Sequence, residues 1–196
     1  MSRLLLALLV ALTLVLPSVA AAGRTQSDPR GDQTTYTAIF LGSGACKDPA
    51  TDLTHLEIVG AGGNLYVNLT VADISGRLSC TVVPVGPEAI TTRVFFQNQF
   101  GWGPSLVVYR EVTYDFGGGK TTKQCFIVQV VQATERCGGT VAGNTIQWVV
   151  PIGEFKIQGA CYETVFAQGL AQPRVEFGHL ALAVTDFIDT ARWLCP

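Results

Sequence analysis

Apolar and polar side chains alternate along most of this chain, and a period of two is typical of half-buried β-strands. The clearest run is Asn64–Val71, which a glycine-rich turn joins to Leu53–Val59 as a predicted hairpin. No segment shows a long helical period, and only Asp186–Trp193 is predicted to form a short helical turn. The other predicted strands are Tyr36–Leu41, Leu78–Val83, Thr91–Asn98, Leu106–Tyr114, Lys123–Ala133, Thr145–Val150, Ala160–Phe166 and Val175–Val184.

The even spacing of these strands, with turn residues between them, predicts an all-β fold. Only 14% of the residues are charged and 21 are glycines, which is typical of a chain rich in strands and tight turns. We find no internal repeat and no sign of a second domain. The sequence therefore predicts a single antiparallel β-sandwich of about 8–10 strands, stapled by disulfides and spanning residues 34–196.

The first 22 residues have the pattern of a secretion signal. Arg3 supplies a positive charge, Leu4–Leu16 is apolar apart from one threonine, and small residues follow Pro17. The apolar stretch is too short to span a bilayer comfortably, so we expect no transmembrane segment after signal cleavage. Residues 23–33 are polar and aperiodic, which predicts a flexible N-terminal arm. We therefore expect a secreted, extracellular protein.

Charge is low and balanced along the chain, with 13 Lys and Arg against 15 Asp and Glu and a net charge of −2. Nucleic-acid binding depends on clustered basic residues, because phosphate contacts supply much of the affinity. No such cluster is present, so neither nucleic acid nor an anionic membrane is expected as a partner.

Six cysteines follow the signal, and an even number on an exported chain predicts disulfides. Zinc binding is the competing interpretation, but it favours close pairs such as C-x-x-C, and none occurs here. Cys125 and Cys137 could join neighbouring strands, while the sequence leaves all fifteen connectivities open. We expect up to three disulfides and no metal site. The cysteines are Cys46, Cys80, Cys125, Cys137, Cys161 and Cys195.

Catalytic patterns are scarce in this chain. Its two histidines, His55 and His179, are expected to be ordinary non-catalytic residues, and no G-x-S-x-G nucleophile elbow is present. Fifteen acidic residues offer carboxylates for glycoside hydrolysis, but their spacing selects no pair. We therefore expect no enzyme, no catalytic residue and no cofactor, and a secreted enzyme is the last of the three functions we consider.

One glycine-rich connection has a composition that suits a carbohydrate ligand. Phe100 and Trp102 lie there beside three amides, Gln97, Asn98 and Gln99. Aromatic faces stack on sugar rings, and amides hydrogen-bond to sugar hydroxyls. The alternative is that the two aromatic side chains fold back onto the core. We predict that these five residues bind the ligand.

Asn68-Leu69-Thr70 matches the acceptor sequence for N-glycosylation. Asn68 falls on the outward face of its predicted strand, which would permit modification in a eukaryotic host. The triplet is also common by chance, so a modified and an unmodified Asn68 both stay open.

Three runs carry a resemblance to a known group of domains. Residues 52–54 read D-L-T, residues 63–72 read G-N-L-Y-V-N-L-T-V-A, and residues 143–151 read G-N-T-I-Q-W-V-V-P. This succession resembles secreted bacterial and archaeal β-sandwich domains related to the DOMON and family 9 carbohydrate-binding groups. The resemblance covers residues 50–170 and implies the same fold.

Members of that broad group bind sugars or haem, or serve as accessory domains. The haem-binding members use a Met/His axial pair, whereas the only methionine here is Met1, inside the predicted signal. A bis-histidine site from His55 and His179 is the remaining route to haem, and we do not expect it. The resemblance thus implies a sugar-binding or accessory domain.

Export, the resemblance and the loop around Trp102 together predict a non-catalytic binding module for carbohydrate or a cell-surface ligand. The alternative is a structural extracellular subunit that self-assembles into a filament or surface layer. Residues 23–33 would then add as a strand to the sheet edge of a neighbouring copy.

Overall fold

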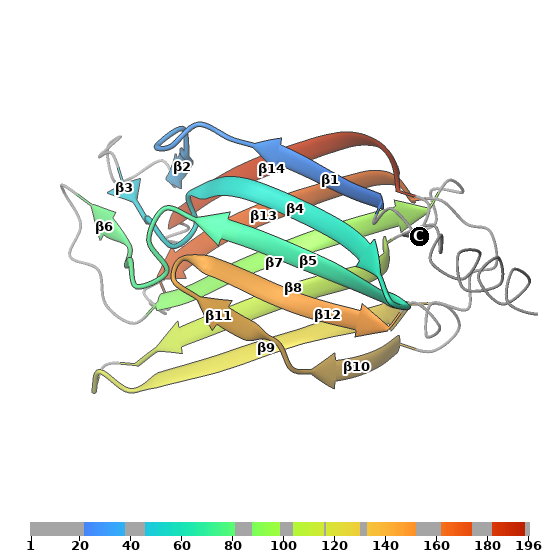
Figure 1. The fold of residues 1–196 in the computed structure, drawn as a ribbon. Helices are drawn as coiled ribbons and strands as arrows, with labels where there is room; N and C mark the ends of the chain where they lie inside the picture. The colour runs from blue at the N-terminus through green and yellow to red at the C-terminus, as the bar shows by residue number, and fades with distance from the viewer. Residues whose placement is uncertain are drawn as a thin grey trace, which may run out of the picture.

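The computed structural model describes residues 22–37, 46–80, 88–98, 104–115, 117–129, 133–151, 162–173 and 182–194. Within these ranges the chain forms fourteen strands and no helix, and the strand pairs are antiparallel. Two large sheets lie face to face, as Figure 1 shows. This arrangement confirms the predicted all-β antiparallel sandwich. In the described ranges, no helix that could cross a membrane is found.

Five strands form the first large sheet, and the predicted hairpin is its centre. The hairpin turn contains Gly62 and Gly63 at φ angles of 58° and 78°, a region that favours glycine. The alternation at Asn64–Val71 predicted its strand without error, and burial alternates residue by residue along it. In order across the sheet the strands are β1 (Ala22–Ser27), β4 (Leu53–Ala61), β5 (Asn64–Val71), β12 (Thr145–Pro151) and β11 (Thr140–Ala142).

Seven strands form the second large sheet. In order across it they are β10 (Ala133–Cys137), β9 (Lys120–Gln129), β8 (Pro104–Tyr114), β7 (Glu88–Asn98), β13 (Tyr162–Pro173), β14 (Leu182–Leu194) and β2 (Thr34–Thr37).

The chain passes from one sheet to the other at both sides of the sandwich. Residues 28–33 lead from β1 to β2, and Gly138-Gly139 lead from β10 to β11. Each outer edge of the two sheets is therefore a short strand of three to six residues. Short edge strands limit the backbone that another chain could pair with.

Apolar side chains from both sheets fill the space between them. Trp148 of β12 is fully buried, and its indole Nε1 donates a hydrogen bond to the carbonyl oxygen of Tyr109 in β8 at 3.1 Å. Because β12 and β8 belong to different sheets, this bond ties the two layers together. On β5, Leu65, Val67 and Leu69 are buried, so the opposite side chains of that strand face outward.

A second, smaller buried cluster closes one end of the sandwich. It includes Ala50 and Leu78, which lie close in sequence to a two-stranded ladder of β3 (Cys46–Lys47) and β6 (Ser79–Cys80). Figure 1 shows this ladder at one end of the sandwich, on the left of the view.

Two fully buried carboxyl groups lie at this end of the fold. Glu88 accepts hydrogen bonds from Arg77 Nε at 2.9 Å and from the Leu78 amide at 3.1 Å. Asp48 accepts a hydrogen bond from the Ala50 amide at 2.7 Å through Oδ1. Its second oxygen, Oδ2, has no hydrogen-bond partner among the described residues. Asp48 is therefore a buried acid that is only half satisfied.

The prediction of a helical turn at Asp186–Trp193 is wrong, because these residues belong to β14. This strand pairs with β13 from Tyr162–Leu194 to Ala171–Val184, with one register shift near its end. The long free side of β13 offers a ladder of backbone partners, and such a ladder outweighs a weak local preference.

Residues 22–27 form strand β1, where the sequence predicts the end of the signal and a flexible arm. β1 pairs with β4 from Ala22–Gly60 to Ser27–His55. Residues 1–21, which hold most of the predicted signal, lie outside the described residues. The strand total exceeds the predicted 8–10 because strands such as β3 and β6, of two residues each, are too short to show alternation.

Candidate functional site

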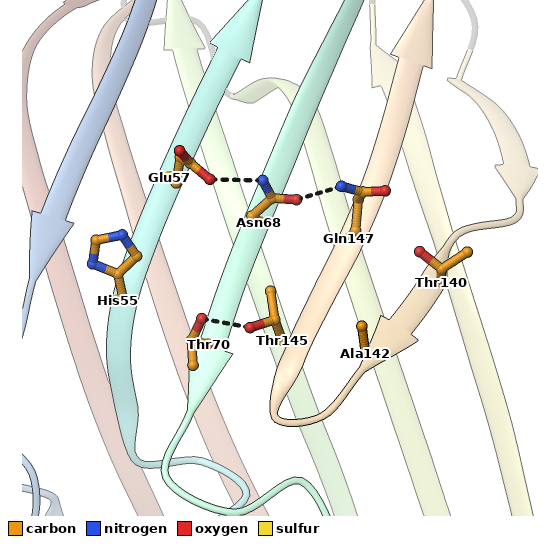
Figure 2. A pocket seen from close by; sticks show the side chains of 8 residues that line it. All are labelled: His55, Glu57, Asn68, Thr70, Thr140, Ala142, Thr145 and Gln147. Carbon is orange, nitrogen blue, oxygen red and sulfur yellow. Dashed lines mark hydrogen bonds between the residues drawn. The ribbon is translucent and has the colours of Figure 1, made fainter.

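The outer face of the five-stranded sheet carries two neighbouring rows of side chains, one residue per strand in each row. Strand register sets both rows, which run from β4 through β5 and β12 to β11. Figure 2 shows the eight side chains on one face of these strands. The first row is Glu57, Asn68, Gln147 and Thr140, and the second is His55, Thr70, Thr145 and Ala142.

These eight residues line an open hollow, which we call the outer groove, with a volume of about 340 Å³. Seven of the eight side chains carry a hydrogen-bonding group, and Ala142 is the exception. The volume is at the lower end of the range for small-molecule sites, which is roughly 300–1,000 Å³. The outer groove is thus large enough for a small polar ligand or one part of a longer one.

The first row forms a directional hydrogen-bond ladder. Asn68 Nδ2 donates to Glu57 Oε2 at 2.9 Å, and Gln147 Nε2 donates to Asn68 Oδ1 at 2.9 Å. A carboxylate only accepts, so Glu57 fixes the orientation of Asn68, which in turn fixes that of Gln147. In the part of the chain that the structure describes, the ladder uses one N–H of each amide. The second side-chain N–H groups of Asn68 and Gln147, together with Gln147 Oε1, can therefore form hydrogen bonds with a ligand.

Hydroxyl groups and an imidazole supply the second row. Thr70 Oγ1 and Thr145 Oγ1 lie 2.9 Å apart and share a hydrogen bond. His55 Nδ1 lies 3.1 Å from Ser27 Oγ of β1, a contact whose donor depends on the imidazole tautomer. This contact orients the ring and leaves Nε2 as its remaining polar atom. The two rows together therefore line the outer groove with hydrogen-bond donors and acceptors.

The ligand residues predicted from sequence fall largely outside the described ranges. Gln97 and Asn98 end β7, where their backbones face Thr164 and Tyr162 of β13. Their side chains lie outside the description. Three further predicted residues lie wholly outside the described residues, as does one of the two histidines: Gln99, Phe100, Trp102 and His179.

Of the three ladder residues, the sequence singled out only Asn68. It did so because Asn68 begins an N-glycosylation triplet and not because of a predicted ladder. Glu57 and Gln147 were missed because outward polar residues on a strand look alike in sequence. The alternation of apolar and polar residues along each strand does assign Glu57 and Gln147 to the outer face of the sheet. Only the register of β4, β5 and β12 shows that they stand side by side.

Of the predicted disulfides, the bond between Cys125 and Cys137 is present, across the β9–β10 pair. Cys46 and Cys80 face each other in the β3–β6 ladder, with side chains outside the description. Cys161 and Cys195 lie outside the described residues.

Three aspartates meet where residues 28–33 pass between the sheets. Carboxylate oxygens of Asp28, Asp32 and Asp186 all lie within 4.8 Å of one another. Oxygen ligands of this kind are those that Ca²⁺ prefers, so these are the described residues that could hold a cation. The sequence predicted no metal-binding residue here, because the three are far apart along the chain and only the fold joins them.

One of these aspartates, Asp186, also has a structural role. Asp186 is buried, and it accepts hydrogen bonds from the Leu53 amide at 2.7 Å and the Phe187 amide at 2.9 Å. The pKa of Asp186 is raised to about 6, chiefly by burial and also by the charges of Asp32 and Asp28, although the two amides act to lower it. Burial also raises the pKa of Asp28. Asp186 thus fixes β14 to the start of β4.

The outer face of the seven-stranded sheet has a different character. Phe95 and Phe166 stack with their ring centroids 4.5 Å apart, and the Arg93 guanidinium lies 5.0 Å from the Phe95 centroid. Because the two rings face each other, each has one face already covered. Desolvation by burial lowers the pKa of Arg93. Among the described residues, this face therefore presents a packed aromatic pair.

Comparison with protein-family models, with curated proteins and with solved structures finds no match for this chain.

Proposed function

We propose that this protein is a secreted, non-catalytic binding module and that the outer groove binds carbohydrate. The observation that carries the proposal is the ladder of Glu57, Asn68 and Gln147 in an open hollow. Sugars present closely spaced hydroxyl groups, each a donor and an acceptor, and the groove is lined by amide, hydroxyl and carboxylate groups that can hydrogen-bond to them. Export and the loop around Trp102, predicted from the sequence, agree with this function.

The composition of the outer groove favours binding over hydrolysis. Glu57 is the only carboxylate among its eight described lining residues. Glycoside hydrolysis in most families uses a pair of carboxylates about 5–10 Å apart. A neutral, hydroxyl-rich ligand suits a site with one carboxylate and several amides and hydroxyls better than an anionic ligand does.

The proposal constrains the glycosylation of Asn68. A glycan attached to Asn68 Nδ2 would stand in the outer groove and replace one N–H of the ladder. A protein that carries a glycan on Asn68 therefore cannot bind a free ligand in the outer groove. The binding experiments are best made on protein from a host without N-glycosylation.

A glycan array followed by calorimetric titration tests the proposal. We expect the intact protein to bind at least one glycan, and Gln147→Ala to weaken that binding about tenfold. The loss corresponds to one or two hydrogen bonds, about 1.4 kcal/mol. The truncation leaves the backbone contact of Gln147 with Gln124 in place.

Gln172→Ala is the matched control, since Gln172 is an exposed glutamine on β13 of the other sheet. Its affinity should equal that of the unmodified protein. An array without hits, or equal affinities for Gln147→Ala and Gln172→Ala, would refute the proposed site.

Self-assembly by strand addition remains the alternative function. β1 fills the side of β4 that an incoming strand would use, so assembly would need β1 to exchange between copies. Light scattering on the native protein decides this point. Monodisperse monomers would remove the alternative, and ordered oligomers would favour it.

A further inference from the structure

We propose that Cys46 and Cys80 form a disulfide, and that the six cysteines pair in sequence order, each with its neighbour along the chain. One bond of this map, Cys125–Cys137, is already in the structure. The other two are Cys46–Cys80 and Cys161–Cys195. This is one of the fifteen pairings that six cysteines allow.

Backbone register is the first ground for Cys46–Cys80. The two residues are direct partners in the antiparallel ladder of β3 and β6. Opposite residues in such a ladder have Cα atoms about 4.5–5.5 Å apart. A disulfide needs Cα atoms about 4.4–6.8 Å apart, so the backbone meets the requirement without rearrangement.

Contacts beyond the ladder hold the two segments in this register. The Ala72 amide donates to the Asp52 carbonyl oxygen at 2.8 Å, and the Asp73 amide donates to the Pro49 carbonyl oxygen at 3.0 Å. Gly76 packs so closely that an added Cβ would lie 2.8 Å from the Pro49 Cβ. The juxtaposition of the cysteines therefore does not depend on the two-residue strands alone.

The third pair follows by elimination once the other four cysteines are paired. In the β13–β14 ladder, Tyr162 and Leu194 are the outermost described partners. Cys161 and Cys195, which lie outside the described residues, are the next residues of the sequence on either side.

The pairing has a consequence for the outer groove. A Cys46–Cys80 bond closes a loop around the hairpin of β4 and β5, which carries half of the groove side chains. The Cys125–Cys137 bond joins β9 to β10. None of the three loops that the proposed bonds close overlaps another in sequence.

Bond formation requires an oxidant of the disulfide class. The two thiols lose two protons and two electrons, one S–S bond forms, and the donor disulfide is reduced to two thiols.

Trypsin separates all six cysteines, because Lys or Arg stands between each neighbouring pair. Peptide mass spectrometry of the unreduced, alkylated protein then identifies every crosslink. We expect Cys46 in Gly31–Lys47 to be linked to Cys80 in Leu78–Arg93, and Cys161 in Ile157–Arg174 to be linked to Cys195 in Trp193–Pro196. Any crosslink between Gly31–Lys47 and a different peptide, or alkylated Cys46 in the unreduced protein, would overturn the proposal.

A thiol count on two variants provides an independent check. Cys46→Ser should expose one free thiol, at Cys80, and Cys46→Ser/Cys80→Ser should expose none. Both variants should keep the Cys125–Cys137 crosslink, which reports that the rest of the fold has formed. A Cys46→Ser variant whose free thiol lies at Cys161 or Cys195 would contradict the sequence-order pairing.

Discussion

Gly169 lies where β13 passes against the backbone of residue Thr51, and the space there admits no side chain. A Cβ at this position would lie 2.2 Å from the Thr51 carbonyl oxygen and 2.9 Å from its Cα. Backbone atoms cannot rotate away as a flexible side chain can, so the strand itself would have to shift. Glycine is therefore required here by close packing.

We expect Gly169→Ala to lower the free energy of unfolding by about 3 kcal/mol, measured by urea denaturation. Gly117→Ala is the control, because its Cβ would meet only the Asp115 carboxylate oxygen at an ordinary 3.5 Å. The control should change stability by less than about 0.5 kcal/mol. Equal effects of the two substitutions would show that Gly169 is not tightly packed.

Asp48 illustrates how one buried acid makes stability depend on pH. Its pKa is raised to about 6, chiefly by burial and also by the Glu88 charge, although the Ala50 and Thr51 amides and Arg77 act to lower it. The unfolded pKa is 3.8, so between pH 4 and pH 6 the folded state retains a proton that the unfolded state has lost. The contribution of Asp48 to stability therefore falls as the pH rises through this window.

Asp48→Asn removes this dependence, since an amide does not titrate. We compare the free energy of unfolding of the variant with that of the unmodified protein at each pH. We expect this difference to be more favourable to the variant at pH 7 than at pH 4, by on the order of 1–3 kcal/mol. Urea denaturation of both proteins at the two pH values measures this difference. If the two proteins differ in free energy of unfolding by the same amount at pH 4 and at pH 7, the pKa of Asp48 is not raised.

At the scale of the elements, β1 protects the edge of the five-stranded sheet. β4 is nine residues long, and β1 satisfies its outer backbone groups along six register positions. Without β1, β4 would present an unpaired edge, which is a template for pairing with another chain. β1 also supplies Ser27, which contacts His55 of the outer groove.

We expect a chain that begins at Asp28 to self-associate more and to melt at a lower temperature than one that begins at Gly23. Size-exclusion chromatography with light scattering and thermal denaturation measure the two effects. If the shorter chain stays monomeric with an unchanged melting temperature, β1 does not protect this edge.

Elements also differ in how well their sequence predicts them. The strand at Asn64–Val71 was predictable because one of its faces is buried and the other is not, so its pattern is local. β14 was missed at Asp186–Trp193 because its strand form depends on the ladder with β13, which no local pattern records. The shortest strands, β3 and β6, likewise depend on tertiary contacts.

For the molecule as a whole, the sandwich was predictable and the candidate site was not. The sandwich follows from alternation and turn residues, which repeat along the chain. The outer groove depends on the order of the strands across the sheet. In that order β12 lies beside β5, although 73 residues separate Val71 from Thr145. Glu57, Asn68 and Gln147 become a ladder only in that order. A one-residue slip of register would send their side chains to the core.

Nitrogen-15 NMR during a glycan titration shows directly whether carbohydrate binds in the outer groove. The side-chain amide groups of Asn68 and Gln147 carry N–H groups that such spectra detect, and both belong to the ladder. With a glycan selected on the array, we predict that both signals shift and saturate together with the binding isotherm. Signals of Gln172, on the other sheet, should not move. Saturable shifts of other signals, with those of Asn68 and Gln147 unchanged, would show that the glycan binds outside the outer groove.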